Sequence, residues 1–293
     1  MEPLAFARRV RPSRASTWTA FGLAALAAAL VWRGIAFYRL SLDARVDHDD
    51  FRVLSPSATI GHGYGVVGTV LILTNLLYLV RKKFPTWRVG SVQAWLSMHV
   101  FTGLAGAMLI TFHSAFQVRT PIAMVTSVTL LLTVVTGLFG RYMVHFSARP
   151  EGERTRATLE AIDSLVPGTM KLVQEGLRRL PPTPLPPHPT LLNCIARIPS
   201  WVADERKRRR FVREALHELS DRVPHDETLA REFWRLGSDV AYHAAREVRV
   251  LWSNALLTSW RGMHRIVAIA MILSVSVHIW VALKYGYWWI FSQ

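Results

Sequence analysis

Four histidines occur as two pairs with the same internal spacing, and each pair lies in an apolar segment. His99 and His113 are 14 residues apart, and so are His264 and His278. In an α-helix, 14 residues rise about 21 Å and make almost four whole turns, so both histidines of a pair project from nearly one face. Two such helices side by side would offer two stacked pairs of imidazoles. Because imidazole is an axial ligand of haem iron, the spacing predicts two bis-histidine haems, one near each side of a membrane.

Five apolar segments are long enough to cross the hydrocarbon core of a membrane, which needs about 20 residues. We place them near residues 17–38, 61–81, 93–117, 121–145 and 262–284. The first segment is too long for a cleavable signal peptide and lacks a small-residue cleavage site, so we expect a retained helix. The sequence therefore predicts an all-α membrane protein with five transmembrane helices.

The net charge of +15 is distributed unevenly along the chain. Basic residues cluster before the first span and between the second and third, whereas the loop 39–58 carries four aspartates. By the positive-inside rule, the N-terminus is cytoplasmic, the loop 39–58 periplasmic and the C-terminus periplasmic. This placement explains the charge without a nucleic-acid partner, and it predicts a multi-pass protein of the bacterial inner membrane in contact with lipid.

The same topology divides the chain into four parts. We expect a basic cytoplasmic N-terminus at 1–16, four transmembrane helices at 17–145, a helical cytoplasmic insertion at 146–261, and the fifth helix with a periplasmic C-terminus at 262–293.

Within the insertion, amphipathic stretches predict helices from Glu153 to Leu180, from Pro199 to Asp221 and from Thr228 onward, with a proline-rich linker at 181–187. The last helix is expected to continue into the fifth span, because no proline or glycine lies between Ser238 and Trp260. The basic run 206–210 fits anionic headgroups, an acidic partner protein or a solvated helix face.

The cysteine content restricts the cofactor. Cys194 is the single cysteine, which excludes disulfides within the chain and iron–sulfur clusters held by this chain alone. The sequence also lacks a Cys-x-x-Cys-His motif, so covalent c-type haem is excluded. Any haem here is non-covalent.

The topology decides how the histidines pair. The third and fifth spans both run from the cytoplasm to the periplasm, since one antiparallel span separates them. His99 and His264 therefore fall on the cytoplasmic side, and His113 and His278 on the periplasmic side. This arrangement predicts a dihaem four-helix bundle built from the second to fifth spans.

Glycines and arginines accompany these positions. Haem is bulky, so small residues are expected where it lies against a helix backbone; the alternative is that they let transmembrane helices pack closely. Arginines near each pair are candidate partners of the haem propionates or snorkelling anchors. The glycines are Gly65, Gly68, Gly103, Gly106, Gly137 and Gly140, and the basic residues are Arg119, Arg141, Arg261, Arg265 and Lys284.

Two further histidines lie at the ends of spans, His62 in the second and His145 in the fourth. Each fits a haem ligand replacing one of the four, a propionate partner, part of a quinone site, or an ordinary interfacial polar residue.

Equal 14-residue spacing on two parallel spans, with one span between them, resembles the haem-binding core of the cytochrome b family of quinol-oxidising complexes. It is also similar to the dihaem membrane subunits that anchor bacterial oxidoreductases. The resemblance covers the second to fifth spans and implies that the four paired histidines ligate two haems b. The chain departs from the cytochrome b family in lacking a Pro-Glu-Trp-Tyr motif and in its long insertion.

These observations predict transmembrane electron transfer, with electrons exchanged with quinone or with redox partner subunits. Such partners would be a periplasmic cytochrome or a cytoplasmic iron–sulfur or flavin protein, in a hetero-oligomer, and any substrate turnover would belong to them. One alternative is a metal transporter with intramembrane histidine ligands. Another is an assembly or signalling protein whose working part is the insertion.

Overall fold

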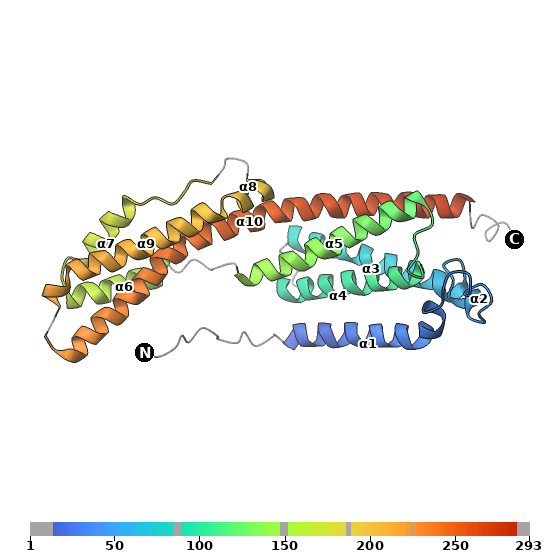
Figure 1. Ribbon diagram of the computed structural model, residues 1–293, viewed down its shortest axis with the longest axis horizontal. Helices are drawn as coiled ribbons and strands as arrows, with labels where there is room; N and C mark the ends of the chain where they lie inside the picture. Colours follow the sequence, from blue (N-terminus) through green and yellow to red (C-terminus); the bar gives the residue numbers. More distant parts are fainter. Residues whose placement is uncertain (1–13, 85–88, 147–151, 186–188, 224, 286–293) are drawn as a thin grey trace. The chain divides into compact units, whose positions relative to one another are not determined.

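The described part of the chain is helical, as the sequence predicts. The computed structural model describes residues 14–84, 89–146, 152–185, 189–223 and 225–285 (Figure 1). Among them, five helices are long and apolar enough to cross a membrane, which confirms the predicted number. They are α1 (Arg14–Tyr38), α3 (Thr59–Lys83), α4 (Val92–His113), α5 (Pro121–Phe146) and α10 (Glu227–Tyr285).

The chain forms two compact units. The first unit comprises residues 1–135 and 268–293, and the second comprises residues 136–267. Both α5 and α10 contribute to each unit. The predicted insertion, 146–261, lies inside the second unit.

In the first unit, the second to fifth spans share one apolar cluster. Ile72 of α3, Leu130 of α5 and Met271 of α10 are buried in it, and Ile110 of α4 packs against them. Met271 lies seven residues, about two helical turns, before His278. These four helices therefore share an apolar cluster about two turns from the level of that histidine.

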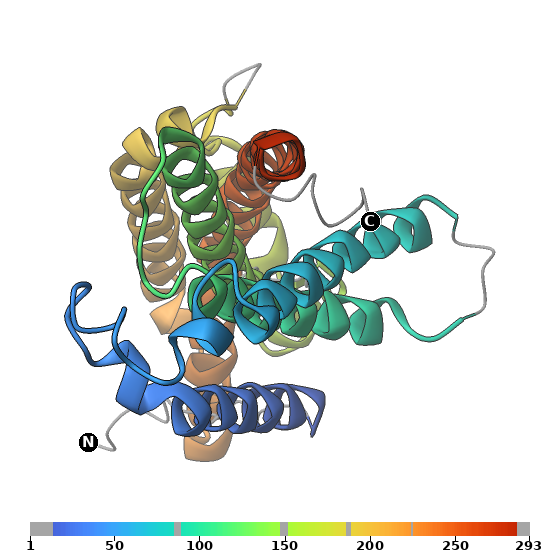
Figure 2. The same ribbon diagram turned by 90° about the vertical axis from the view of Figure 1, so that its right-hand side faces the viewer.

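Helices α3 and α4 lie side by side in antiparallel directions (Figure 2). They approach closely at Gly68 and Gly106, where a Cβ built on either residue would lie within 2.9 Å of the other's carbonyl oxygen. Because that neighbour is backbone and cannot rotate away, both positions require glycine. Small residues here permit close helix packing.

Helix α4 ends earlier than the sequence predicts. The third span was expected to reach residue 117, but α4 stops at His113. Ala115 and Phe116 then adopt left-handed conformations, with φ of 49° and 61°, which an α-helix cannot contain. Earlier in the chain, the loop 39–58 contains a short helix, α2 (Phe51–Leu54), which was not predicted.

The predicted single helix from Glu153 to Leu180 is wrong. The segment contains α6 (Gly152–Leu165) and α7 (Thr169–Arg178). Pro167 lies between them, and Gly168 has a left-handed φ of 92°. Proline followed by such a glycine ends one helix and redirects the chain.

Two more helices complete the second unit. α8 (Leu191–Ala196) was not predicted, and α9 (Ile198–Glu218) matches the expected helix closely. The main core lies between α6, α7, α9 and α10; its fully buried members include Ile162, Val173, Val212, Phe233 and Val240.

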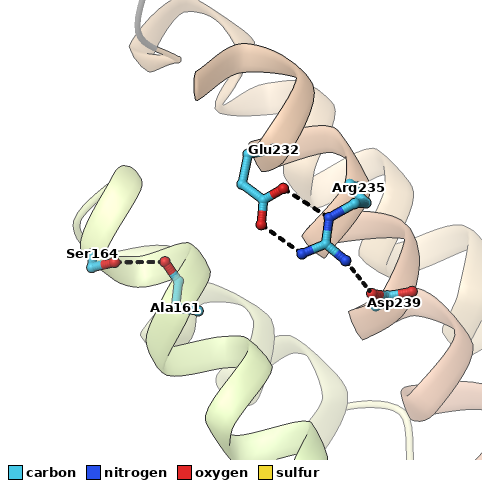
Figure 3. A network of polar contacts seen from close by, with 5 residues as sticks. All are labelled: Ala161, Ser164, Glu232, Arg235 and Asp239. Carbon is cyan, nitrogen blue, oxygen red and sulfur yellow. Dashed lines mark hydrogen bonds and ion pairs between the residues drawn. The ribbon is translucent and has the colours of Figure 1, made fainter. Parts of the chain in front are cut away.

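The expected continuity of α10 is confirmed, because one helix runs from Glu227 to Tyr285. Asp226 caps its N-terminus by accepting hydrogen bonds from Thr228 and Leu229, which hold the pKa of Asp226 below its usual value. In the next turns Arg235 bridges Glu232 and Asp239 (Figure 3). These exposed pairs add little to stability, so packing against α9 and α6 supports this part of the helix.

The glycine contact between α3 and α4 leads to a first prediction. Gly68→Ala should destabilise the protein by about 1–3 kcal/mol, because the new methyl group has no room beside a backbone oxygen. Gly63→Ala on the same helix is the matched control, since a Cβ there meets nothing within 4 Å. Unfolding of both variants in detergent would measure the difference, and equal stability of the two would contradict the packing role.

Candidate functional site

His113 has the hydrogen bond expected of a metal-binding imidazole. Its Nδ1 lies 2.9 Å from the carbonyl oxygen of Gly61. Because a carbonyl only accepts, Nδ1 carries the proton and Nε2 keeps its lone pair. Metal-ligating histidines typically show this arrangement, in which the second ring nitrogen donates to a carbonyl.

Two other histidines lie near His113 within the first unit. The ring of His62 is 6.3 Å from that of His113, centroid to centroid, and His278 lies within electrostatic range of it. The structure therefore brings His113 and His278 to the same end of the first unit, together with His62.

His99 and His278 have unsatisfied ring nitrogens. Within the part of the chain that the structure describes, Nδ1 of each is buried and has no hydrogen-bond partner. The His99 ring bonds the backbone of Asn75 and lies 5.2 Å from the Tyr78 ring. A buried nitrogen without a partner is costly, so both positions suit a group that coordinates or bonds the imidazole.

His264 belongs to the second unit, where two residues, Thr136 and Trp260, hold its ring. Its Nδ1 is 2.8 Å from Oγ1 of Thr136. The indole of Trp260 stacks on it at 5.4 Å and 17°, and the indole Nε1 donates to the Thr136 carbonyl at 2.8 Å. His99 lies in the first unit, so its pairing with His264 stays a prediction.

The six predicted glycines have different surroundings. A Cβ on Gly140 would fall inside the Trp260 ring, and one on Gly103 would lie 3.2 Å from Nδ2 of Asn75. Together with Gly68 and Gly106, these two are explained by packing against protein.

The remaining two glycines lie beside the candidate ligands. A Cβ on Gly65 would lie 2.8 Å from Nδ1 of His113, and one on Gly137 would lie 3.5 Å from Cε1 of His264. These are the two positions where a small residue leaves room next to an imidazole.

The predicted propionate partners lie near the surface of the described chain. Arg119 and Arg265 are exposed and Arg141 is half-buried; Arg119 donates to the Gln117 side chain at 2.7 Å. Arg261 donates to the Leu257 carbonyl, and the Lys284 ammonium lies over the rings of Trp280 and Tyr285. The side chain of His145 lies outside the described residues.

A buried arginine that the sequence did not single out closes the His113 end of the first unit. Arg45 is 7% exposed and donates to the carbonyls of Leu40, Tyr38 and Ala115 at 3.1, 2.7 and 2.8 Å. Its guanidinium also lies over the Phe37 ring. In the sequence Arg45 stands among aspartates in a polar loop, which indicates exposure. Its burial follows from two helix ends that present carbonyls to one cation.

Among the described residues, no group of three or more His, Cys, Asp or Glu side chains could hold a metal ion. Comparison with known proteins found no matching family model, curated protein or solved structure.

The Arg45 contacts generate a second prediction. Arg45→Gln should destabilise the protein by about 2 kcal/mol or more, because buried carbonyls at two helix ends lose their donor. It should also speed trypsin cleavage in the loop 39–58. Arg52→Gln, at an exposed arginine of the same loop, should change neither the unfolding temperature nor cleavage elsewhere in the loop. Identical behaviour of the two variants would show that Arg45 does not hold the loop.

Proposed function

We propose that this protein transfers electrons across a bacterial inner membrane through two non-covalent haems b. His99 and His264 would hold one haem, and His113 and His278 the other. Bound haem supplies a reversible one-electron iron couple. The proposal includes the cytoplasmic N-terminus, the periplasmic C-terminus and electron exchange with quinone or with redox partner subunits.

One observation carries the proposal: four imidazoles at two matched 14-residue spacings lie on helices that are long and apolar enough to cross a membrane. His113 donates through Nδ1 to the Gly61 carbonyl, as ligating histidines do. Among the described residues, the buried Nδ1 of His99 and that of His278 have no hydrogen-bond partner. Imidazoles are costly in hydrocarbon and are functional candidates there. Their proximity supports the periplasmic pair, because His113 and His278 lie within electrostatic range.

Residues around the proposed ligands then have different roles. The Gly61 carbonyl selects the tautomer of His113, and Gly65 and Gly137 leave space beside the imidazoles. The buried apolar residues Ile72, Leu130 and Met271 lie together between the helices and would exclude water there. A dry layer at that point would keep the membrane closed to ions while electrons pass.

Haem content is the third prediction and tests the function directly. Protein purified from membranes should contain two haems per chain by acid–acetone extraction and show a b-type spectrum on reduction. His113→Ala and His278→Ala should each lower haem content to about one per chain, because a haem with one axial ligand is held weakly. His225→Ala, at an exposed histidine of the second unit, should keep both haems.

Two results would contradict the proposal. Folded protein that contains less than one haem per chain would exclude it. Zinc or another transition metal in place of iron would favour the metal-handling alternative.

Gly137 provides a fourth prediction that separates haem contact from helix packing. Gly137→Ala places a methyl group 3.5 Å from Cε1 of His264, which is ordinary van der Waals contact. We therefore expect stability within about 0.5 kcal/mol of wild type but reduced haem content, because the methyl group would meet the macrocycle. Gly63→Ala is again the control, and it should change neither property. Two haems in a stable Gly137→Ala protein would show that haem does not lie against this position.

A further inference from the structure

The surroundings of His264 contain a closed set of contacts between α5 and α10. Trp260 precedes His264 by four residues on α10, so the two side chains lie on the same helix face. Their rings are nearly parallel, at 17° and 5.4 Å between centroids. Thr136 of α5 contacts both residues: its hydroxyl is 2.8 Å from His264 Nδ1, and its carbonyl accepts from Trp260 Nε1 at 2.8 Å.

A notch in α5 fixes the indole in this position. At Gly140, one turn after Thr136, a built Cβ would lie 1.7 Å from Cζ2 of Trp260. The indole therefore occupies the space that any other side chain at 140 would fill. With its edge in the notch and its N–H bonded to a carbonyl, the indole presents one fixed face to the imidazole.

We infer that Trp260 and Thr136 are positioning residues that fix the ring plane and the bonded nitrogen of His264. The indole face restricts rotation of the imidazole about its χ2 angle, and the Thr136 hydroxyl engages Nδ1. Coordination is then directed to Nε2. This inference rests on the proposed function, because it assigns these residues a role toward the iron-binding nitrogen of His264.

The two better-held imidazoles differ in their partners. Nδ1 of His113 faces a carbonyl, which only accepts, whereas Nδ1 of His264 faces a hydroxyl, which can accept or donate. The tautomer of His113 is fixed by one hydrogen bond. The tautomer of His264 depends on the orientation of the Thr136 hydroxyl, whereas the stacked indole restricts the plane of the ring.

The fifth prediction uses conservative variants of Thr136. Thr136→Val removes the hydroxyl at nearly constant volume, and Thr136→Ser restores it. In the haem-loaded protein, Thr136→Val should change the low-spin ferric EPR signal of one haem and leave the other unchanged. Thr136→Ser should retain the wild-type signal. A purely structural role of Thr136 would not move one EPR signal selectively.

A second readout does not need haem. Carbethoxylation of His264, followed by mass spectrometry on protein prepared without haem, reports how firmly the imidazole is held. We expect modification to be about threefold to tenfold faster in Thr136→Val and in Gly140→Ala, since each loses a contact worth about one hydrogen bond. Trp252→Phe is the matched control, because Trp252 is also a stacked tryptophan of α10, paired with Trp201, and His264 reactivity should be unchanged.

Failure of the proposed function and failure of the positioning role give different results. Wild-type protein without haem would refute the proposed function, and the carbethoxylation rates would still decide whether the imidazole is held. Haem-loaded Thr136→Val with unchanged EPR signals and an unchanged carbethoxylation rate would overturn the positioning role while leaving electron transfer intact.

Discussion

An imidazole inside a membrane must satisfy its ring nitrogens with groups from its own chain or from a ligand, because hydrocarbon offers no hydrogen bonds. This constraint organises the membrane-spanning helices. His113 meets it with the Gly61 carbonyl and His264 with the Thr136 hydroxyl. His99 and His278 each leave a buried Nδ1 without a partner in the described chain. A group that hydrogen-bonds or coordinates these two nitrogens would remove the cost of burying them.

The glycines show how packing and ligand space are divided along these helices. Gly68 and Gly106 bring two backbones into contact, and Gly140 admits the Trp260 indole. Gly65 and Gly137 instead face the imidazoles of His113 and His264. A sequence pattern of small residues cannot separate these roles, because both require only the absence of a Cβ. The two roles are distinguished by the atoms that a Cβ built at each glycine would contact.

The sequence predicted the helices correctly where one local signal dominates. Apolar length predicted five spanning helices, and the absence of Pro and Gly between Ser238 and Trp260 predicted the continuous α10. Local signals were also present for the break at Pro167 and Gly168, but helical periodicity on both sides outweighed them. The early end of α4 carried no such signal, because Ala115 and Phe116 have no intrinsic preference for left-handed backbone.

Long-range contacts could not be predicted from the sequence. Arg45 is buried because helix ends far apart in the chain direct carbonyls at one point. The Trp260–Thr136 contact joins residues separated by more than a hundred positions. Neither the polar loop around Arg45 nor the apolar segment around Trp260 indicates these partners. Tertiary structure decides them.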